Sequence, residues 1–134
     1  MNPKSDKDTR WKQRFQNLDH AIKNLQAAVD IIDPSDVEQA GIIQFFEIAF
    51  ELSWKTMKDY LQHAGYDTKT PRDTIKQAYQ TGIIEEGHDW LEMLEKRNEL
   101  SHTYDEESAA SAVKSIKVRY VDNLVQVYTW LKSK

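Results

Sequence analysis

Apolar residues near the start of the chain recur at alternating intervals of four and three positions, and this spacing limits the possible folds most. The series comprises Trp11, Phe15, Leu18, Ile22, Leu25, Val29 and Ile32. At 3.6 residues per turn these side chains share one face, as in helices that pack in bundles. We therefore expect a long helix over residues 11–32. It should stop at Asp33, because Pro34 disfavours helix at the residue before it, and Ser35 or Asp36 can cap the next helix.

Four more helices follow from the same kind of pattern, and no segment alternates as a strand would. The second helix should carry apolar residues around about 200° of its circumference, so it should contact neighbours on two sides. Candidate caps for the last helix are Thr103 paired with Glu106, or Asp105 paired with Ser108. The expected ranges are about 37–63, a short helix from 71 to the glycine at 82, 86–101, and about 105–131.

Composition limits the class of protein. The 134 residues suit one domain, 1–134, and contain no cysteine, so a disulfide framework or thiolate zinc site is excluded. No apolar run reaches the roughly 20 residues of a membrane span, and the N-terminus is polar, so we expect a cytoplasmic protein without membrane contact. The net charge of −4 argues against binding nucleic acid over the whole surface. The short basic group Lys114, Lys117 and Arg119 is expected to be a solvated face.

The sequence RNELSHTY, residues 97–104, places an arginine where a helix should present an apolar residue. Counting back from Arg97 in steps of three and four leads to Leu94, Met93 and Trp90. A buried arginine needs a partner or a function, because unpaired burial of charge is costly. On a straight helix His102 would point about 140° away from Arg97. The two can converge only if the chain bends, or if a second copy contributes its own pair.

Arginine, histidine and tyrosine at this spacing are suited to phosphodiester chemistry without a metal. Arg97 offers a planar fork of donors for a phosphate, and His102 can take or give a proton at a ribose 2′-OH. Alternatively, Arg97 pairs with a carboxylate inside the bundle, such as Glu47 or Glu51, and His102 merely ends the helix. Spacing alone does not decide between these two interpretations.

The segment RNELSHTY resembles the Arg-x4-6-His-x-Tyr motif of HepT-like proteins, a branch of the HEPN superfamily also described as nucleotidyltransferase substrate-binding proteins. Asn98 after the arginine also fits, and FFEIAFELSWKTMKDYLQHAG is similar to the family's second helix. The resemblance runs from Trp11 to about Leu131. It implies an all-α, up-and-down four-helix bundle with an additional short helix. It also implies a homodimer in which two motif copies face each other across a cleft.

For function, the resemblance implies a toxin that is a metal-independent endoribonuclease, with Arg97 and His102 as catalytic residues and RNA as substrate. Its antitoxin would be an MNT-type nucleotidyltransferase that attaches AMP to Tyr104. That modification would put phosphate beside Arg97. No metal or other cofactor is expected. The residues expected to support the site are Asn98, Ser101, Glu47 and Glu51.

The resemblance leaves two other functions open. The protein could be the non-catalytic substrate-binding subunit of a two-component nucleotidyltransferase, since the sequence lacks the Gly-Ser and paired-Asp motif of a catalytic domain. It could also be an inactive dimeric bundle. The presence of Arg97, His102 and Tyr104 together favours the toxin, because a binding subunit has no evident need for all three.

Overall fold

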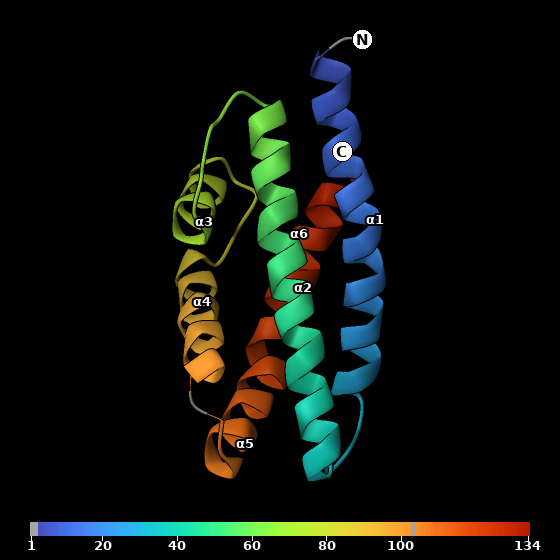
Figure 1. The fold of residues 1–134 in the computed structure, drawn as a ribbon, viewed down its shortest axis with the longest axis vertical. Helices are drawn as coiled ribbons and strands as arrows, with labels where there is room; N and C mark the ends of the chain where they lie inside the picture. Colours follow the sequence, from blue (N-terminus) through green and yellow to red (C-terminus); the bar gives the residue numbers. More distant parts are fainter. Residues whose placement is uncertain (1–2, 103) are drawn as a thin grey trace.

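A computed structural model describes residues 3–102 and 104–134, which form helices joined by short loops (Figure 1). No strand occurs within these two ranges. The elements are α1 (Pro3–Val29), α2 (Asp36–His63), α3 (Pro71–Gln80), α4 (Gly87–His102), α5 (Glu106–Ser115), the π-helical turn η1 (Ile116–Tyr120) and α6 (Val121–Lys132). None of the described helices is both long and apolar enough to cross a membrane.

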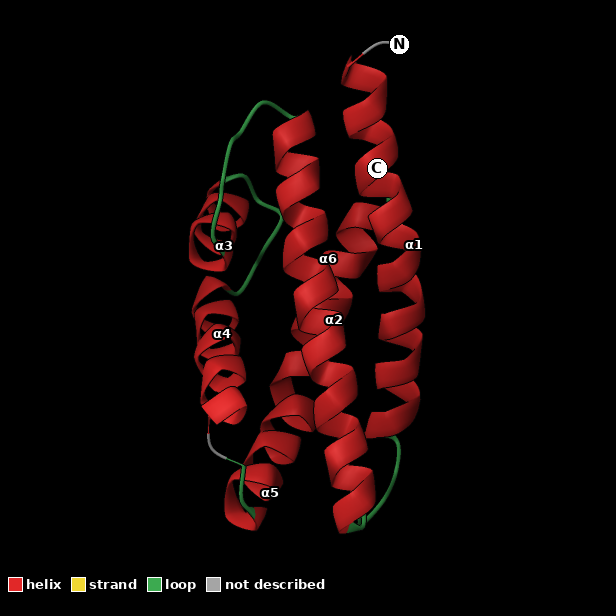
Figure 2. Ribbon diagram, in the orientation of Figure 1, coloured by secondary structure: helices red, strands yellow, loops and turns green. Residues whose placement is uncertain are grey.

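The helices form an up-and-down bundle with α2 at its centre (Figure 2). Helices α1 and α2 lie side by side along most of their length, and α6 packs against both. Helices α3 and α4 lie on the other side of α2 (Figure 1). Since α5, η1 and α6 follow one another directly, four long helical units and the short α3 make up the fold. The predicted four-helix bundle with an additional short helix is confirmed.

Aromatic side chains of α2 connect the two sides of the bundle. Phe46 stacks on Tyr120 of η1 with ring centroids 5.6 Å apart. Phe50 lies 5.9 Å from Trp90 of α4, measured between ring centroids. All four rings are fully buried. The expected burial of α2 on two sides is therefore confirmed, and its packing fixes α4 relative to the centre of the bundle.

The first helix ends earlier than its apolar spacing predicts. Helix α1 stops at Val29, and Ile32 is 86% exposed, so including Ile32 in the buried series was wrong. The backbone of Asp33 has φ 48°, a left-handed conformation in front of Pro34 that does not continue a helix. The reversal into α2 therefore begins one turn before the position that the apolar pattern suggests.

Side-chain caps define where the later helices begin. Ser35 caps α2 and forms a reciprocal capping box with Glu38. Thr70 caps α3, with its hydroxyl accepting from the backbone N–H of Asp73 at 3.1 Å. Asp105 caps α5 by accepting from the backbone N–H of Ser108 at 2.8 Å. The alternative cap, Thr103, lies outside the described residues.

The predicted last helix contains a wider turn that apolar spacing did not reveal. In η1 the backbone N–H of Val121 donates to the carbonyl of Ile116, five residues back. Ile116 and Tyr120 remain fully buried across this turn. The helix therefore keeps its apolar face, but the turn inserts a local change of pitch that apolar spacing does not predict.

Candidate functional site

Arg97 is held on α4 by contacts to three side chains. Its Nη2 donates to the carboxylate of Glu51 on α2 at 2.6 Å, and its Nη1 donates to Oδ1 of Asn98 at 2.9 Å. The guanidinium carbon lies 5.9 Å from the centroid of the Phe50 ring, within the range of a cation–π contact. Two hydrogen bonds leave the guanidinium with further N–H donors.

The position of Arg97 on an apolar stripe has a direct explanation in these contacts. Trp90, Met93 and Leu94 of the same stripe are buried, whereas the side chain of Arg97 keeps 27% of its surface exposed. Its stem follows the stripe toward α2 and its charged end meets Glu51. The arginine therefore has the partner that its partial burial requires, and its charged end still reaches the surface.

The charge of Arg97 changes the titration of Glu51. Burial alone would raise the pKa of Glu51, but the hydrogen bond and the charge of Arg97 outweigh burial and hold the pKa below its usual value. Lys55 lies 3.6 Å from the same carboxylate, one helical turn along α2. Glu51 therefore stays ionised at neutral pH and binds Arg97 as a charged acceptor.

An open pocket of about 360 Å³ lies beside this ion pair, between α2 and α4. Its lining residues are Gln44, Glu47, Ile48, Glu51, Arg97 and Ser101. The Ser101 hydroxyl donates to the backbone carbonyl of Asn98 at 2.7 Å, which holds it against α4. Burial raises the pKa of Glu47, and the charge of Arg97 offsets this only in part. The pocket thus combines a cation, two carboxylates of different proton affinity and a hydroxyl group.

His102 is the last residue of α4 and is exposed. Helix α4 is continuous from Gly87 to His102, so the chain does not bend between Arg97 and His102. Five positions along a regular helix turn the direction by about 140°. Within one chain, therefore, the arginine faces α2 and the histidine points elsewhere.

Tyr104 is 55% exposed and lines a different pocket from Arg97. This second pocket, of about 280 Å³, lies between the first turns of α2 and α5, with Val37, Ala40 and Ala109 in its wall. The two pockets follow one another along α2, at residues 36–40 and 44–51. In a single chain, Tyr104 and Arg97 therefore line neighbouring but separate pockets.

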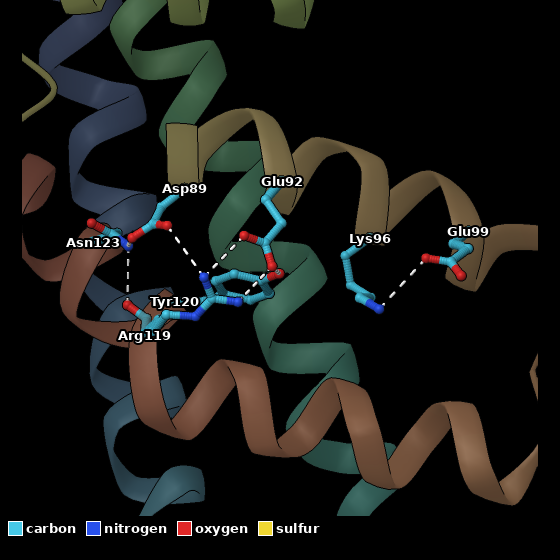
Figure 3. A network of polar contacts seen from close by, with 7 residues as sticks. All are labelled: Asp89, Glu92, Lys96, Glu99, Arg119, Tyr120 and Asn123. Carbon is cyan, nitrogen blue, oxygen red and sulfur yellow. Dashed lines mark hydrogen bonds and ion pairs between the residues drawn. The ribbon is translucent and has the colours of Figure 1, made fainter. Parts of the chain in front are cut away.

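A polar network joins α4 to the π-helical turn η1 and to the start of α6 (Figure 3). Arg119 donates to Glu92 through both terminal nitrogens, at 3.0 Å and 2.5 Å, and to Asp89 at 3.4 Å. The Tyr120 hydroxyl donates to the same Glu92 carboxylate at 3.0 Å. Asn123 donates to Asp89 at 3.0 Å. The network holds the first half of α4 in place. Arg97 and His102 lie further along the same helix.

Sequence reasoning missed two parts of this arrangement. Phe50 supports Arg97, but its apolar spacing on α2 indicated only a core role. Arg119 was expected on a solvated face, yet it joins the network with α4, and Lys117 donates to the backbone carbonyl of Ile31. Acidic residues at three-residue spacing on α4, Asp89 and Glu92, were the available signal for Arg119. Among the described residues, no group of three or more His, Asp or Glu side chains is arranged to hold a metal ion.

Comparison with known proteins places the chain in a family. Residues 13–133 match the family model described as "Nucleotidyltransferase substrate binding protein like". A Haemophilus influenzae protein named "Probable ribonuclease HepT" is 36% identical, and the match covers 78% of this chain and 83% of the relative.

Two solved structures share the fold. A protein of Thermus thermophilus has a TM-score of 0.81 and 30% identity, with 86% of this chain and 98% of that chain covered. A tri-AMPylated HEPN toxin of Shewanella oneidensis, solved in complex with an MNT antitoxin, has a TM-score of 0.74 and 16% identity, with both chains fully covered. From the family model and the HepT relative, the chain is HepT-like and belongs to the nucleotidyltransferase substrate binding protein like family.

Proposed function

We propose that the protein is the toxin of a HepT/MNT-type toxin–antitoxin pair and acts as a metal-independent endoribonuclease in the cytoplasm. The observation that supports this most is the state of Arg97. Glu51, Asn98 and Phe50 hold its guanidinium at the wall of an open pocket, with N–H donors left for a ligand. A guanidinium held in this way suits the charged phosphate of RNA. The 36% identity to a relative named "Probable ribonuclease HepT" supports the same activity.

A homodimer would complete the site. Arg97 and His102 diverge along a straight α4. A second copy whose α4 faces the first could bring its His102 to the pocket of Arg97, and the reverse by symmetry. In this arrangement Arg97 binds the scissile phosphate and stabilises its developing charge. His102 of the second copy transfers a proton, which would contribute about 10²–10⁴-fold to the rate.

Control of the toxin would act at Tyr104. Its phenol is 55% exposed and lies just after the motif helix, where a partner enzyme can reach it. We propose that an MNT-type nucleotidyltransferase transfers AMP to this hydroxyl. The added phosphate and nucleoside would occupy the surface next to the Arg97 pocket and would repel RNA. The related fold of a tri-AMPylated HEPN toxin in complex with its MNT antitoxin supports this proposal.

The second candidate function is a non-catalytic substrate-binding subunit of a two-component nucleotidyltransferase. The description of the matching family favours it. In that case the pocket at Arg97 would bind the phosphate of a substrate or nucleotide, and all catalytic groups would belong to the partner chain.

Cleavage of RNA by the purified, unmodified protein in EDTA would test the proposal. Total RNA and tRNA serve as substrates, with His102→Ala and Arg97→Ala as variants and intact mass as proof that Tyr104 is unmodified. We expect cleavage by the wild type and its loss in both variants. If the unmodified wild type cuts neither substrate, the substrate-binding subunit becomes the better proposal.

A further inference from the structure

The pocket beside Arg97 contains two carboxylates in different situations. Glu51 is bound to Arg97 at 2.6 Å and lies 3.6 Å from Lys55. Glu47, one turn earlier on α2, lines the same pocket and is partly buried. In the described part of the chain, Glu47 makes no hydrogen bond or ion pair by the criteria that identify the Glu51 contacts. Its carboxylate is therefore available to a bound molecule, whereas that of Glu51 is not.

We infer that Glu47 is the general base of the proposed ribonuclease, accepting the proton of the ribose 2′-OH while Arg97 of the same pocket binds the adjacent phosphate. The inference rests on the proposed function and adds to it. Metal-free cleavage of RNA by the 2′-OH needs one group to take a proton and another to give one. The motif histidine can fill only one of these roles in each site, and Glu47 fills the other.

The proton and bond changes balance with these groups alone. The 2′-OH loses its proton to Glu47, and its oxygen attacks phosphorus to form a 2′,3′-cyclic phosphate. The bond from phosphorus to the 5′-oxygen breaks, and this oxygen takes a proton from the protonated His102 of the second copy. Glu47 then loses the proton to water, and His102 regains one. The products are a cyclic phosphate end and a 5′-hydroxyl end.

The surroundings of Glu47 agree with this role. The other ionisable groups that line the pocket are Glu51, from the same helix, and Arg97, from α4. Burial raises the pKa of Glu47 above its usual value, which makes its carboxylate a stronger base. Glu51 has a lowered pKa and is therefore the weaker base of the two.

The test compares Glu47→Gln with Glu51→Gln, which removes the same charge from the next turn of the same helix. Cleavage of a fluorescent RNA oligonucleotide by the full-length protein in EDTA is measured from pH 4 to 9. Circular dichroism and molecular mass check fold and oligomeric state. We expect the wild-type rate to fall at acid pH as Glu47 becomes protonated. Glu47→Gln should lower the rate about 10²–10⁴-fold and abolish this acid limb. Glu51→Gln should lower the rate but keep the limb.

Each outcome decides between the two proposals. If Glu47→Gln cleaves like the wild type, or loses rate while keeping the acid limb, the inference fails and the nuclease proposal stands. If the wild type does not cleave, both fail. Glu47→Asp serves if Glu47→Gln does not fold. For Glu47→Asp, a reduced kcat with the acid limb retained would support the inference, because the shorter side chain keeps the carboxylate but moves it away from the 2′-OH. An unchanged kcat would overturn the inference.

Discussion

Arg97 and Glu51, 46 positions apart in the chain, are joined by a hydrogen bond of 2.6 Å between the guanidinium and the carboxylate. The pair links the motif helix to the central helix at the edge of an open pocket. Both charges are partly exposed, so the pair adds little to stability, on the order of 1 kcal/mol or less. Its main effect is on direction, because the bond holds the guanidinium at the wall of the pocket, where its remaining N–H groups can still donate.

Replacing Glu51 with Gln should therefore reduce cleavage more than stability. A neutral amide binds Arg97 less firmly, and misplacement of the guanidinium by about 1 Å can cost up to about 100-fold in rate. We expect a roughly 10- to 100-fold lower kcat/KM and a free energy of unfolding within about 1 kcal/mol of the wild type. Urea unfolding and cleavage assays measure the two quantities. If the free energy of unfolding fell by as much as the loss of kcat/KM corresponds to, Glu51 would act mainly by stabilising the fold.

Tyr104→Phe should separate RNA cleavage from its regulation by AMP addition. The variant keeps the ring but lacks the hydroxyl that accepts AMP, so it should cleave RNA like the wild type. Incubation with an MNT-type nucleotidyltransferase and ATP should add AMP to the wild type and leave the variant without AMP at residue 104, as measured by peptide mass spectrometry. Tyr79→Phe is the matched control, since Tyr79 is 56% exposed but lines a different pocket. Loss of modification in the control, with Tyr104 still present, would contradict the assignment.

The hydroxyl of Tyr120 should contribute about 1 kcal/mol to stability through its hydrogen bond to Glu92. Burial, together with Glu92, raises the pKa of Tyr120 to about 12 from its ordinary value of 10.0. Because the folded pKa is the higher one, this contribution is complete below pH 10 and is lost as the pH rises toward 12.

Tyr120→Phe should accordingly be less stable than the wild type at neutral pH, and the difference should shrink between about pH 10 and 12. Chemical unfolding at several pH values measures this difference. Tyr66→Phe is the control, because Tyr66 is exposed and its loss should not change stability. A difference that grows with pH would show that the sign of the linkage is wrong.

Two glycines should respond to alanine in opposite ways. Gly41 lies inside α2 with no atom within 4 Å of an added Cβ, so Gly41→Ala should stabilise the chain by about 0.5–1 kcal/mol. Gly82 has φ 85°, which alanine adopts only at a cost of about 1–2 kcal/mol. Thermal unfolding should show a higher Tm for the first variant and a lower Tm for the second. A lower Tm for Gly41→Ala would indicate that a second copy covers this position.

Much of the fold could be predicted from apolar spacing and helix caps. Helix α2 runs over Asp36–His63 against an expected range of about 37–63, and Ser35 and Asp105 act as caps as proposed. The pattern failed at Ile32, where the left-handed Asp33 reverses the chain early. The pattern also did not reveal η1. Ile116 and Tyr120 stay buried across the π turn, so the turn leaves no sign in the apolar spacing.

The site was less predictable because its contacts join distant segments. Sequence reasoning identified Arg97 and offered Glu47 and Glu51 as alternative partners. Which carboxylate meets the guanidinium depends on how α4 lies along α2, and the sequence does not contain this relationship. The separation of Tyr104 and Arg97 into two pockets likewise depends on how α5 leaves the end of α4.

The long separation of Glu51 and Arg97 in the chain also determines when the pocket can exist during synthesis. The ribosome releases α1 and α2 first, and they can pair while the rest of the chain is still being made. The guanidinium reaches its carboxylate only after α4 has left the exit tunnel and docked on α2. The pocket proposed to bind RNA is therefore absent for most of the chain's translation.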